Sequence, residues 1–256
     1  WAFGYLGGLF CLSLIFLLLH FTKTQDYRIF NISVFLLIGP FVGIWTLLFG
    51  FSHLKNFSGE AFNIPNIVNF IYDIRNSKIS GFLLSYFFFN NAVISIFAFA
   101  SMFASFLFGL RESEILFLGV FINLSGILGC IILGSYEDRV SSEKIVLICV
   151  IGLLLSTTSL YFIDDKIFFW ALSLTIGFFV GPIQAASRTV IVKKIKKTNQ
   201  LSAFCSFSMF GNICAILGPF LVGLLIDIKN DIKIGLLVIP FFLIISLIPL
   251  IKKSSV

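Results

Sequence analysis

The chain is 256 residues long, and its composition excludes an ordinary water-soluble fold. Hydrophobic residues make up 59% of it and charged residues 12%, whereas soluble domains are about half apolar and about a quarter charged. The formal net charge of +6 does not indicate nucleic-acid binding, because the basic residues lie beside apolar runs, where membrane proteins carry them on the cytoplasmic side. The composition, with a mean hydropathy of +1.07, predicts an integral membrane protein.

Eight apolar runs are each long enough to cross about 30 Å of hydrocarbon, which takes about 20 helical residues. They lie at residues 1–21, 30–51, 80–104, 115–135, 145–163, 167–191, 203–226 and 234–251. We therefore expect an all-α, polytopic transmembrane helix bundle with eight spans. The chain begins with Trp1 already inside an apolar run and holds only Met102 and Met209 as methionines. We expect it to be N-terminally incomplete.

The polar segment 52–79 separates the second run from the third. Within it, Asn63 is typical of a helix N-cap, Pro65 suits the first turn, and isoleucines recur at helical spacing. This pattern predicts an amphipathic helix lying on the membrane surface. We expect three parts: two spans in 1–51, a cytoplasmic linker in 52–79 and a six-span bundle in 80–256.

The basic residues are distributed unequally between the two sides of the expected bundle. Connections on one side carry 12 Lys and Arg residues and those on the other side carry 6. The richer side faces the cytoplasm by the positive-inside rule. Both the start of the first span and the C-terminus then lie in the cytoplasm, and we expect a multi-pass protein of a bacterial cytoplasmic (inner) membrane.

The segment 177–197 changes from apolar to strongly basic. Gly177 and Gly181 lie one helical turn apart, which allows another helix to approach closely. Pro182 has no amide hydrogen, so it leaves the carbonyl of Phe178 without its helical donor. We expect a packing face and a break in this span. Further candidates for helix packing or bending are Gly4, Gly8, Pro40, Gly218, Pro219 and Pro240.

Neutral polar side chains lie inside several runs, whereas all 12 acidic residues lie at span ends or in connections. We therefore expect no carboxylate at membrane depth for a proton relay. Buried amides need partners, and they find them either in other helices or in a transported solute; both readings stay open. The candidate pathway residues are Asn90, Asn91, Asn123, Gln184, Ser208 and Asn212. Spans three, six and seven should line the pathway, through Asn91, Gln184 and Asn212.

The five cysteines all lie in apolar runs, without CxxC spacing and without nearby histidines. They are typical of small hydrophobic residues in a membrane protein. His20 and His53 lie far apart at span ends. We therefore expect no metal site, no cofactor and no catalytic residues.

The connection after the fourth run reads GSYEDRVSSEK, from Gly134 to Lys144. With Asp138 and Arg139, it resembles the short loop of the major facilitator superfamily, although Ser141 replaces the usual glycine. The chain as a whole resembles the "unknown major facilitator" family, relatives of the autophagy-related vacuolar effluxers. Further motifs that carry this resemblance are GYLGG at 4–8, GPIQAASR at 181–188 and FGNICAILGPFLVGLLID at 210–227.

The resemblance covers nearly the whole chain and aligns its eight spans with the last eight of twelve. It implies a secondary transporter that moves a small solute by alternating access, coupled to an ion or proton, with amino acids as one candidate class and export as the direction. The family often has an aromatic residue, an asparagine and an acidic residue at the start of its C-terminal half. Phe89, Asn90 and Asn91 stand there in this chain, which argues against proton coupling through that position.

We also expect a gate at the cytoplasmic ends of the spans, where Asp138 would face the unpaired amides that begin the first span. The alternative is that Asp138 pairs with Arg139 or Lys144 in a solvated turn. The candidate gate residues are Gly134, Asp138, Arg139, Lys144, Ser187 and Arg188. Two other functions stay open: a membrane-embedded enzyme, which would need clustered catalytic groups at membrane depth, and a non-transporting scaffold or remnant.

Overall fold

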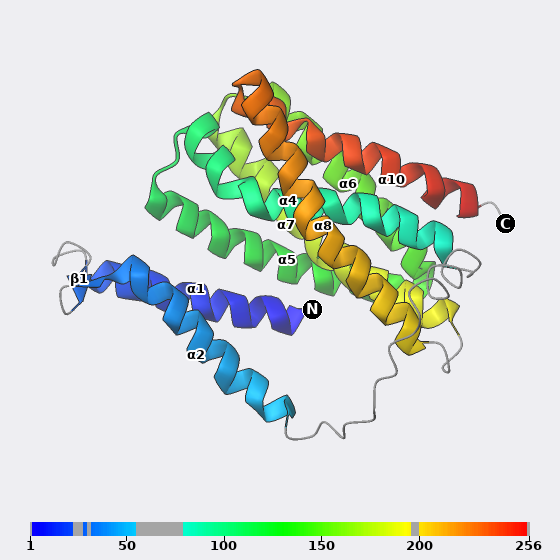
Figure 1. Cartoon of the computed structure of the whole chain (residues 1–256), viewed down its shortest axis with the longest axis horizontal. Helices are drawn as coiled ribbons and strands as arrows, with labels where there is room; N and C mark the ends of the chain where they lie inside the picture. Colours follow the sequence, from blue (N-terminus) through cyan, green and yellow to red (C-terminus); the bar gives the residue numbers. More distant parts are fainter. Residues whose placement is uncertain (1, 23–27, 30–31, 55–78, 196–199, 255–256) are drawn as a thin grey trace.

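The computed structural model is a bundle of helices (Figure 1). It describes residues 2–22, 28–29, 32–54, 79–195 and 200–254. The helices are α1 (Ala2–Thr22), α2 (Val34–Leu54), α4 (Ser80–Phe108), α5 (Glu112–Val140), α6 (Ser142–Phe162), α7 (Lys166–Lys194), α8 (Gln200–Lys229), α9 (Ile232–Leu236) and α10 (Val238–Ser254). The amphipathic helix expected around Asn63 lies outside the described residues.

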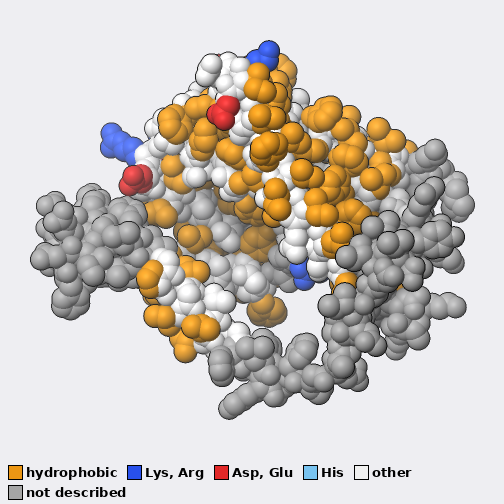
Figure 2. Space-filling view, viewed as in Figure 1, with side chains coloured by type: hydrophobic (Ala, Val, Ile, Leu, Met, Phe, Trp, Pro, Cys, Tyr) orange, Lys and Arg blue, Asp and Glu red, His pale blue; other side chains and the backbone are white. Residues whose placement is uncertain are grey.

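Six described helical segments are long and apolar enough to cross a membrane: α4, α5, α6, α7, α8 and the final segment Ile232–Ile251. They correspond to the last six predicted spans. The helices α1 and α2 have 21 residues each and take the places of the first two. Figure 2 shows hydrophobic side chains over the visible face with few charged ones among them, as a surface in contact with lipid requires.

Local chemistry explains where several helices begin and end. Helix α4 ends at Gly109, whose φ of 62° is the left-handed conformation that favours glycine. The carboxylate of Glu114 accepts a hydrogen bond from the Arg111 amide at 2.7 Å at the start of α5, and Asp165 accepts one from the Ile167 amide at 2.6 Å at the start of α7. These carboxylates satisfy amides that have no partner within the helix.

The last predicted span is interrupted. Helix α9 ends at Leu236 and α10 begins at Val238. Pro240 explains the interruption, because its ring would clash with the carbonyl of Leu236 in a continuous helix. A second small feature joins α1 and α2: strands β1 (Arg28–Ile29) and β2 (Ile32–Ser33) pair antiparallel.

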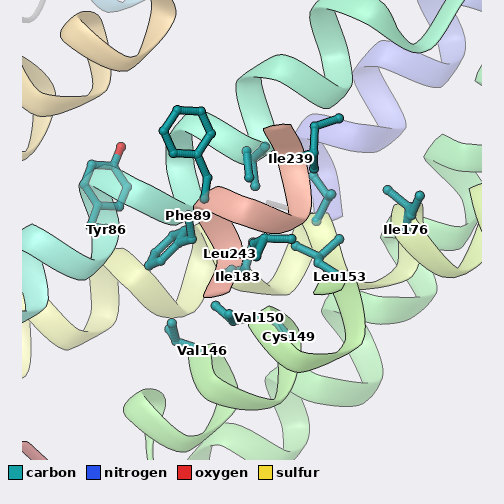
Figure 3. Packing of buried hydrophobic residues seen from close by; sticks show 14 of the residues in the cluster. Tyr86, Phe89, Val146, Cys149, Val150, Leu153, Ile176, Ile183, Ile239 and Leu243 are labelled. Atoms are coloured by element: carbon teal, nitrogen blue, oxygen red, sulfur yellow. The ribbon is translucent and has the colours of Figure 1, made fainter. Parts of the chain in front are cut away.

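The six candidate spans, with α9 and α10 counted as one, form a unit that we call the six-helix unit. Its core lies where α4, α6, α7 and α10 meet. Figure 3 shows side chains of this core, among them Phe89, Val150, Ile183 and Leu243, which are at most 1% exposed. The hydroxyl of Ser85 on α4 donates a hydrogen bond to the Ser246 carbonyl on α10 at 2.6 Å. This bond ties the first and last helices of the unit together.

Helices α5 and α7 cross at backbone contact. A Cβ atom added to Gly177 would lie 2.8 Å from the Ile122 carbonyl oxygen, and one added to Gly181 would lie 2.9 Å from the Gly126 carbonyl oxygen. Only glycine allows this approach. The packing face of the segment 177–197 is therefore occupied by α5.

Helix α1 packs along α5 beside its crossing with α7, where a Cβ added to Gly181 would lie 3.2 Å from the Tyr5 ring. The Tyr5 ring lies against Gly126, and the Phe16 and Phe117 rings are 4.6 Å apart between centroids. Ile15 is the buried residue of this smaller cluster and packs with Leu116. The contact between the first two helices and the six-helix unit thus runs mainly through α1 and α5.

Candidate functional site

A small cavity of about 30 Å³ lies between α4, α7 and α8, and it combines aromatic, amide and basic side chains. Helix α4 provides four of the seven lining residues, α7 provides one polar and one basic residue, and α8 provides one aromatic ring. The lining residues are Tyr86, Phe89, Asn90, Val93, Gln184, Arg188 and Phe207.

The aromatic wall is built from stacked rings. Tyr86 of α4 and Phe207 of α8 stack with centroids 3.9 Å apart and an angle of 25° between planes, and Phe89 meets Tyr86 edge-on at 5.4 Å. Gly211 makes room for the Tyr86 hydroxyl, because a Cβ there would lie 3.2 Å from its oxygen. The rings form a rigid surface that suits the apolar part of a ligand.

The polar wall follows from the helical repeat of α7. Gln184 and Arg188 are four residues apart, so they lie on the same face of the helix, and both line the cavity together with Asn90 of α4. Asn90 is buried, Gln184 is half-buried and Arg188 is exposed. The guanidinium group and two amides can bind an anionic group such as a carboxylate.

Asn91, the neighbour of Asn90, is turned toward α8 and does not line the cavity. Its amide nitrogen donates to the Phe87 carbonyl at 2.7 Å and to the Cys214 sulfur at 3.1 Å. The Cys214 thiol in turn donates to the same carbonyl at 3.2 Å. The two adjacent asparagines thus lie in different environments: Asn90 lines the cavity, and Asn91 lies in the contact between α4 and α8.

The other predicted pathway residues lie apart from the cavity. Asn123 lies at the contact between α5 and α1, where its Oδ1 would be 3.4 Å from a Cβ at Gly8 and its Nδ2 donates to the Gly119 carbonyl at 2.8 Å. Ser208 and Asn212 are exposed on α8. Of the six predicted pathway residues, the structure brings Asn90 and Gln184 together.

The ends of α5 and α7 and the start of α6, which the basic residues predict to be cytoplasmic, lie close together. Lys193 donates to the Ser142 hydroxyl at 3.1 Å, and Lys194 forms an ion pair with Glu143. These contacts hold the end of α7 against the start of α6. Ser187, a predicted gate residue, is buried, and its hydroxyl donates to the Ile183 carbonyl of its own helix.

The remaining gate candidates lie around the turn between α5 and α6. Gly134 is half-buried, and Asp138, Arg139 and Lys144 are exposed. Ser141 has a φ of 146° and caps α6, since its hydroxyl accepts from the Lys144 amide at 3.4 Å. Trp1 lies outside the described residues, so the contact of Asp138 with the start of α1 stays a prediction.

The family described as "Vacuole effluxer Atg22 like" matches residues 1–253 of the chain. The chain belongs to this Atg22-like family. The resemblance drawn from the loop and glycine motifs is thereby confirmed, and the chain is a multi-pass membrane protein of the major facilitator type of transporter.

Two curated proteins show the breadth of the Atg22-like relatives. One is "Uncharacterized MFS-type transporter YxiO" of Bacillus subtilis, 24% identical over 176 residues, or 68% of this chain and 41% of that protein. The other is "Autophagy-related protein 22" of Vanderwaltozyma polyspora, 23% identical over 220 residues, or 82% of this chain and 41% of that protein. Each match thus covers less than half of the relative's length.

Within this Atg22-like chain, the structure adds residues that the sequence pattern did not single out. Tyr86 and Phe207 stand among 6 Tyr and 34 Phe residues, so nothing in their local sequence marks them as cavity residues. Arg188 was assigned to the cytoplasmic gate by its place in the basic segment, yet it also lines the cavity. The spacing of four residues between Gln184 and Arg188 is the sequence signal that could have placed both side chains on one face of the helix.

Proposed function

We propose that this protein is part of a secondary active transporter that moves a small solute by alternating access, and that the cavity between α4, α7 and α8 belongs to the solute pathway. The observation that carries the proposal is one arrangement: Gln184 and Arg188 of α7 share a cavity with Asn90 of α4 and the stacked Tyr86–Phe207 pair. Buried amides such as that of Asn90 are costly inside a membrane-spanning helix and often mark transport pathways.

The lining supports an amphipathic solute with a negatively charged group. The Arg188 guanidinium would pair with that group, and the Asn90 and Gln184 amides would accept or donate further hydrogen bonds. The Tyr86 and Phe207 rings would pack against the apolar part. Amino acids and carboxylate-bearing metabolites fit this description, and the word "effluxer" in the family description supports export as the direction.

The size of the cavity supports a closed conformation. Its volume of about 30 Å³ holds only a few water molecules, whereas sites for small organic ligands measure about 300 Å³ or more. A solute therefore enters only after the helices separate. In the twelve-span arrangement that the resemblance implies, α1 and α2 belong to an N-terminal bundle. Movement of that bundle against the six-helix unit would open the cavity to the solute.

Transport by the full-length gene product in sealed vesicles tests the proposal. Uptake and efflux of labelled amino acids, other carboxylates, neutral sugars and amines would be compared with vesicles that lack the protein. Transport of a carboxylate-bearing solute is expected. A folded protein that moves none of these solutes would contradict the proposal and favour a scaffold or a remnant; conversion of a solute to a new product would favour an enzyme.

A further inference from the structure

Two oxygen atoms at the contact between α4 and α8 have no hydrogen-bond partner among the described residues: Asn91 Oδ1 and Ser95 Oγ. Both side chains are 0% exposed. The Asn91 amide has a defined orientation, because its nitrogen donates to the Phe87 carbonyl, and the oxygen end could not do so. Ser95 differs from Ser156 and Ser187, whose hydroxyls donate to the carbonyl four residues back.

These oxygens face the same point beside Gly218 of α8. A Cβ added to Gly218 would lie 2.6 Å from Ser95 Oγ, 3.2 Å from Asn91 Oδ1 and 2.7 Å from the Asn91 carbonyl oxygen. Pro219 follows directly inside α8. It has no amide hydrogen, so the carbonyl of Ala215 loses its helical donor at the same level of the bundle. At this crossing of α4 and α8, three oxygen atoms therefore lie close together, and two of them, Asn91 Oδ1 and Ser95 Oγ, have no hydrogen-bond partner among the described residues.

We propose that this crossing binds a sodium ion, which is the coupling ion of the transporter; the coupling role rests on the proposed function, whereas the site itself does not. Amide, hydroxyl and carbonyl oxygens are ligands for hard cations, and backbone carbonyls without a helical donor coordinate Na⁺ in transporters. Both helices are continuous here, and Pro219 is the residue that frees such a carbonyl in α8. Amides and hydroxyls do not titrate near neutral pH, so they cannot carry a coupling proton.

The charges around the crossing favour a monovalent cation. Helix α4 contains no Asp or Glu, and the only acidic residue of α8 is Asp227, near its far end. A divalent ion at membrane depth without a carboxylate would keep its full charge in a medium of low dielectric constant, which is far more costly than for a single charge.

The ion site lies beside the solute cavity, so the binding of the ion and the binding of the solute affect each other. Asn91 faces the ion, and Asn90, the preceding residue of α4, lines the solute cavity. A solute carboxylate in the cavity lowers the electrostatic cost of a cation one residue away. By reciprocity, sodium then raises the affinity for the solute by the same factor as the solute raises the affinity for sodium.

Binding of ²²Na⁺ to the purified full-length transporter tests the site, with melting temperatures in NaCl and in choline chloride at equal ionic strength. Sodium should raise the melting temperature in a saturable manner. Ser95→Ala should weaken ²²Na⁺ binding at least tenfold, whereas Ser101→Ala, at an exposed position of the same helix, should leave it unchanged. In choline chloride, Ser95→Ala should be no less stable than the parent, because it removes an unpartnered hydroxyl.

Equal melting temperatures in the two salts, with no ²²Na⁺ binding, would overturn the proposal. A high-resolution map that shows a water molecule hydrogen-bonded to Asn91 Oδ1 in saturating sodium would also overturn it. The outcomes remain separate from those of the proposed function. Sodium-independent transport rejects the coupling role alone, whereas ²²Na⁺ binding that depends on Ser95 in a protein that transports nothing rejects the proposed function and leaves the site standing.

Discussion

The carbonyl oxygen of Phe178 on α7 lies directly against Gly129 on α5. This carbonyl has no helical donor, because Pro182 stands four residues later. A glycine lets the two backbones approach so closely that its Cα hydrogens face the freed oxygen, a weak interaction that recurs between close helices. Helix α7 nevertheless runs continuously from Lys166 to Lys194 through Pro182, so the break expected at this proline is absent and only its effect on the Phe178 carbonyl remains. The freed carbonyl of α7 and the glycine of α5 thus form one structural unit.

Gly129→Ala should destabilise the protein strongly, because its methyl group would overlap the Phe178 carbonyl oxygen and force α5 and α7 apart. Overpacking of this kind costs about 1–3 kcal/mol or more. The matched control is Gly134→Ala on the same helix, where an added Cβ meets no atom within 4 Å. Thermal unfolding in detergent compares the two; equal melting temperatures would contradict the close approach.

Ser141→Gly should preserve or raise stability, whereas Ser141→Ala should lower it. The φ of 146° at Ser141 is strained for any residue with a side chain, at a cost of about 1–3 kcal/mol. Glycine relieves that strain but loses the long 3.4 Å cap to the Lys144 amide; alanine loses the cap and keeps the strain. The melting temperatures of the two variants give the answer, and an alanine variant as stable as the glycine variant would refute the strain.

Gln184→Leu and Arg188→Gln should lower transport while the protein stays folded. Leucine removes an amide from the cavity wall, and glutamine removes the charge that would pair with an anionic solute. The Arg188 variant should lose at least tenfold in affinity for a carboxylate and little for a neutral analogue. Thr175→Val, at an exposed position of α7, is the control. Unchanged kinetics would reassign Gln184 to contacts between helices.

Asp138→Asn should shift the protein toward conformations that are open to the cytoplasm. A carboxylate near the amides that begin a helix contributes about 0.3–1 kcal/mol, up to about 2 kcal/mol when partly buried, which changes a two-state ratio from nearly twofold to about thirtyfold. Distances between spin labels on α2 and α6 measure the shift. An unchanged distribution would leave Asp138 as a surface partner of Arg139 or Lys144.

The two ends of α7 should be labelled from opposite sides of the membrane. The helix has 29 residues, about 43 Å at 1.5 Å per residue, and therefore exceeds the hydrocarbon thickness. Single cysteines at Ile167 and Lys193, in a background without the native cysteines, should react with a membrane-impermeant reagent from the outside and the cytoplasm, respectively. Labelling of both from one side would overturn the orientation derived from the basic residues.

The sequence predicts the long helices well because the membrane thickness sets their length. The runs 80–104 and 203–226 both fall within single helices, α4 and α8. The interruption at Leu237 is harder to place, since Pro240 allows either a bend or a break. The spacing of Gly177 and Gly181 also predicts that they form a packing face. It does not predict that α5 is the helix that packs there.

The candidate site is less predictable, because it depends on the direction of each side chain. Asn90 and Asn91 have the same chemistry and adjacent positions, yet one lines the cavity and the other bonds to Cys214. A helix turns by about 100° per residue, so one step separates the two surfaces. Asn212 has the right chemistry and depth for a pathway residue but lies exposed on α8; only the packing of the helices decides this.

The hydrogen bond between Ser85 and Ser246 joins residues that are 161 positions apart, and this separation matters during synthesis. Helix α4 is the first of the six-helix unit to leave the ribosome, and α10, one of its main packing partners, is the last. Until α10 is inserted, α4 carries polar groups such as Ser85 in the membrane without their final neighbours. A product terminated before α10 would expose these groups to lipid, and cellular quality control should degrade it.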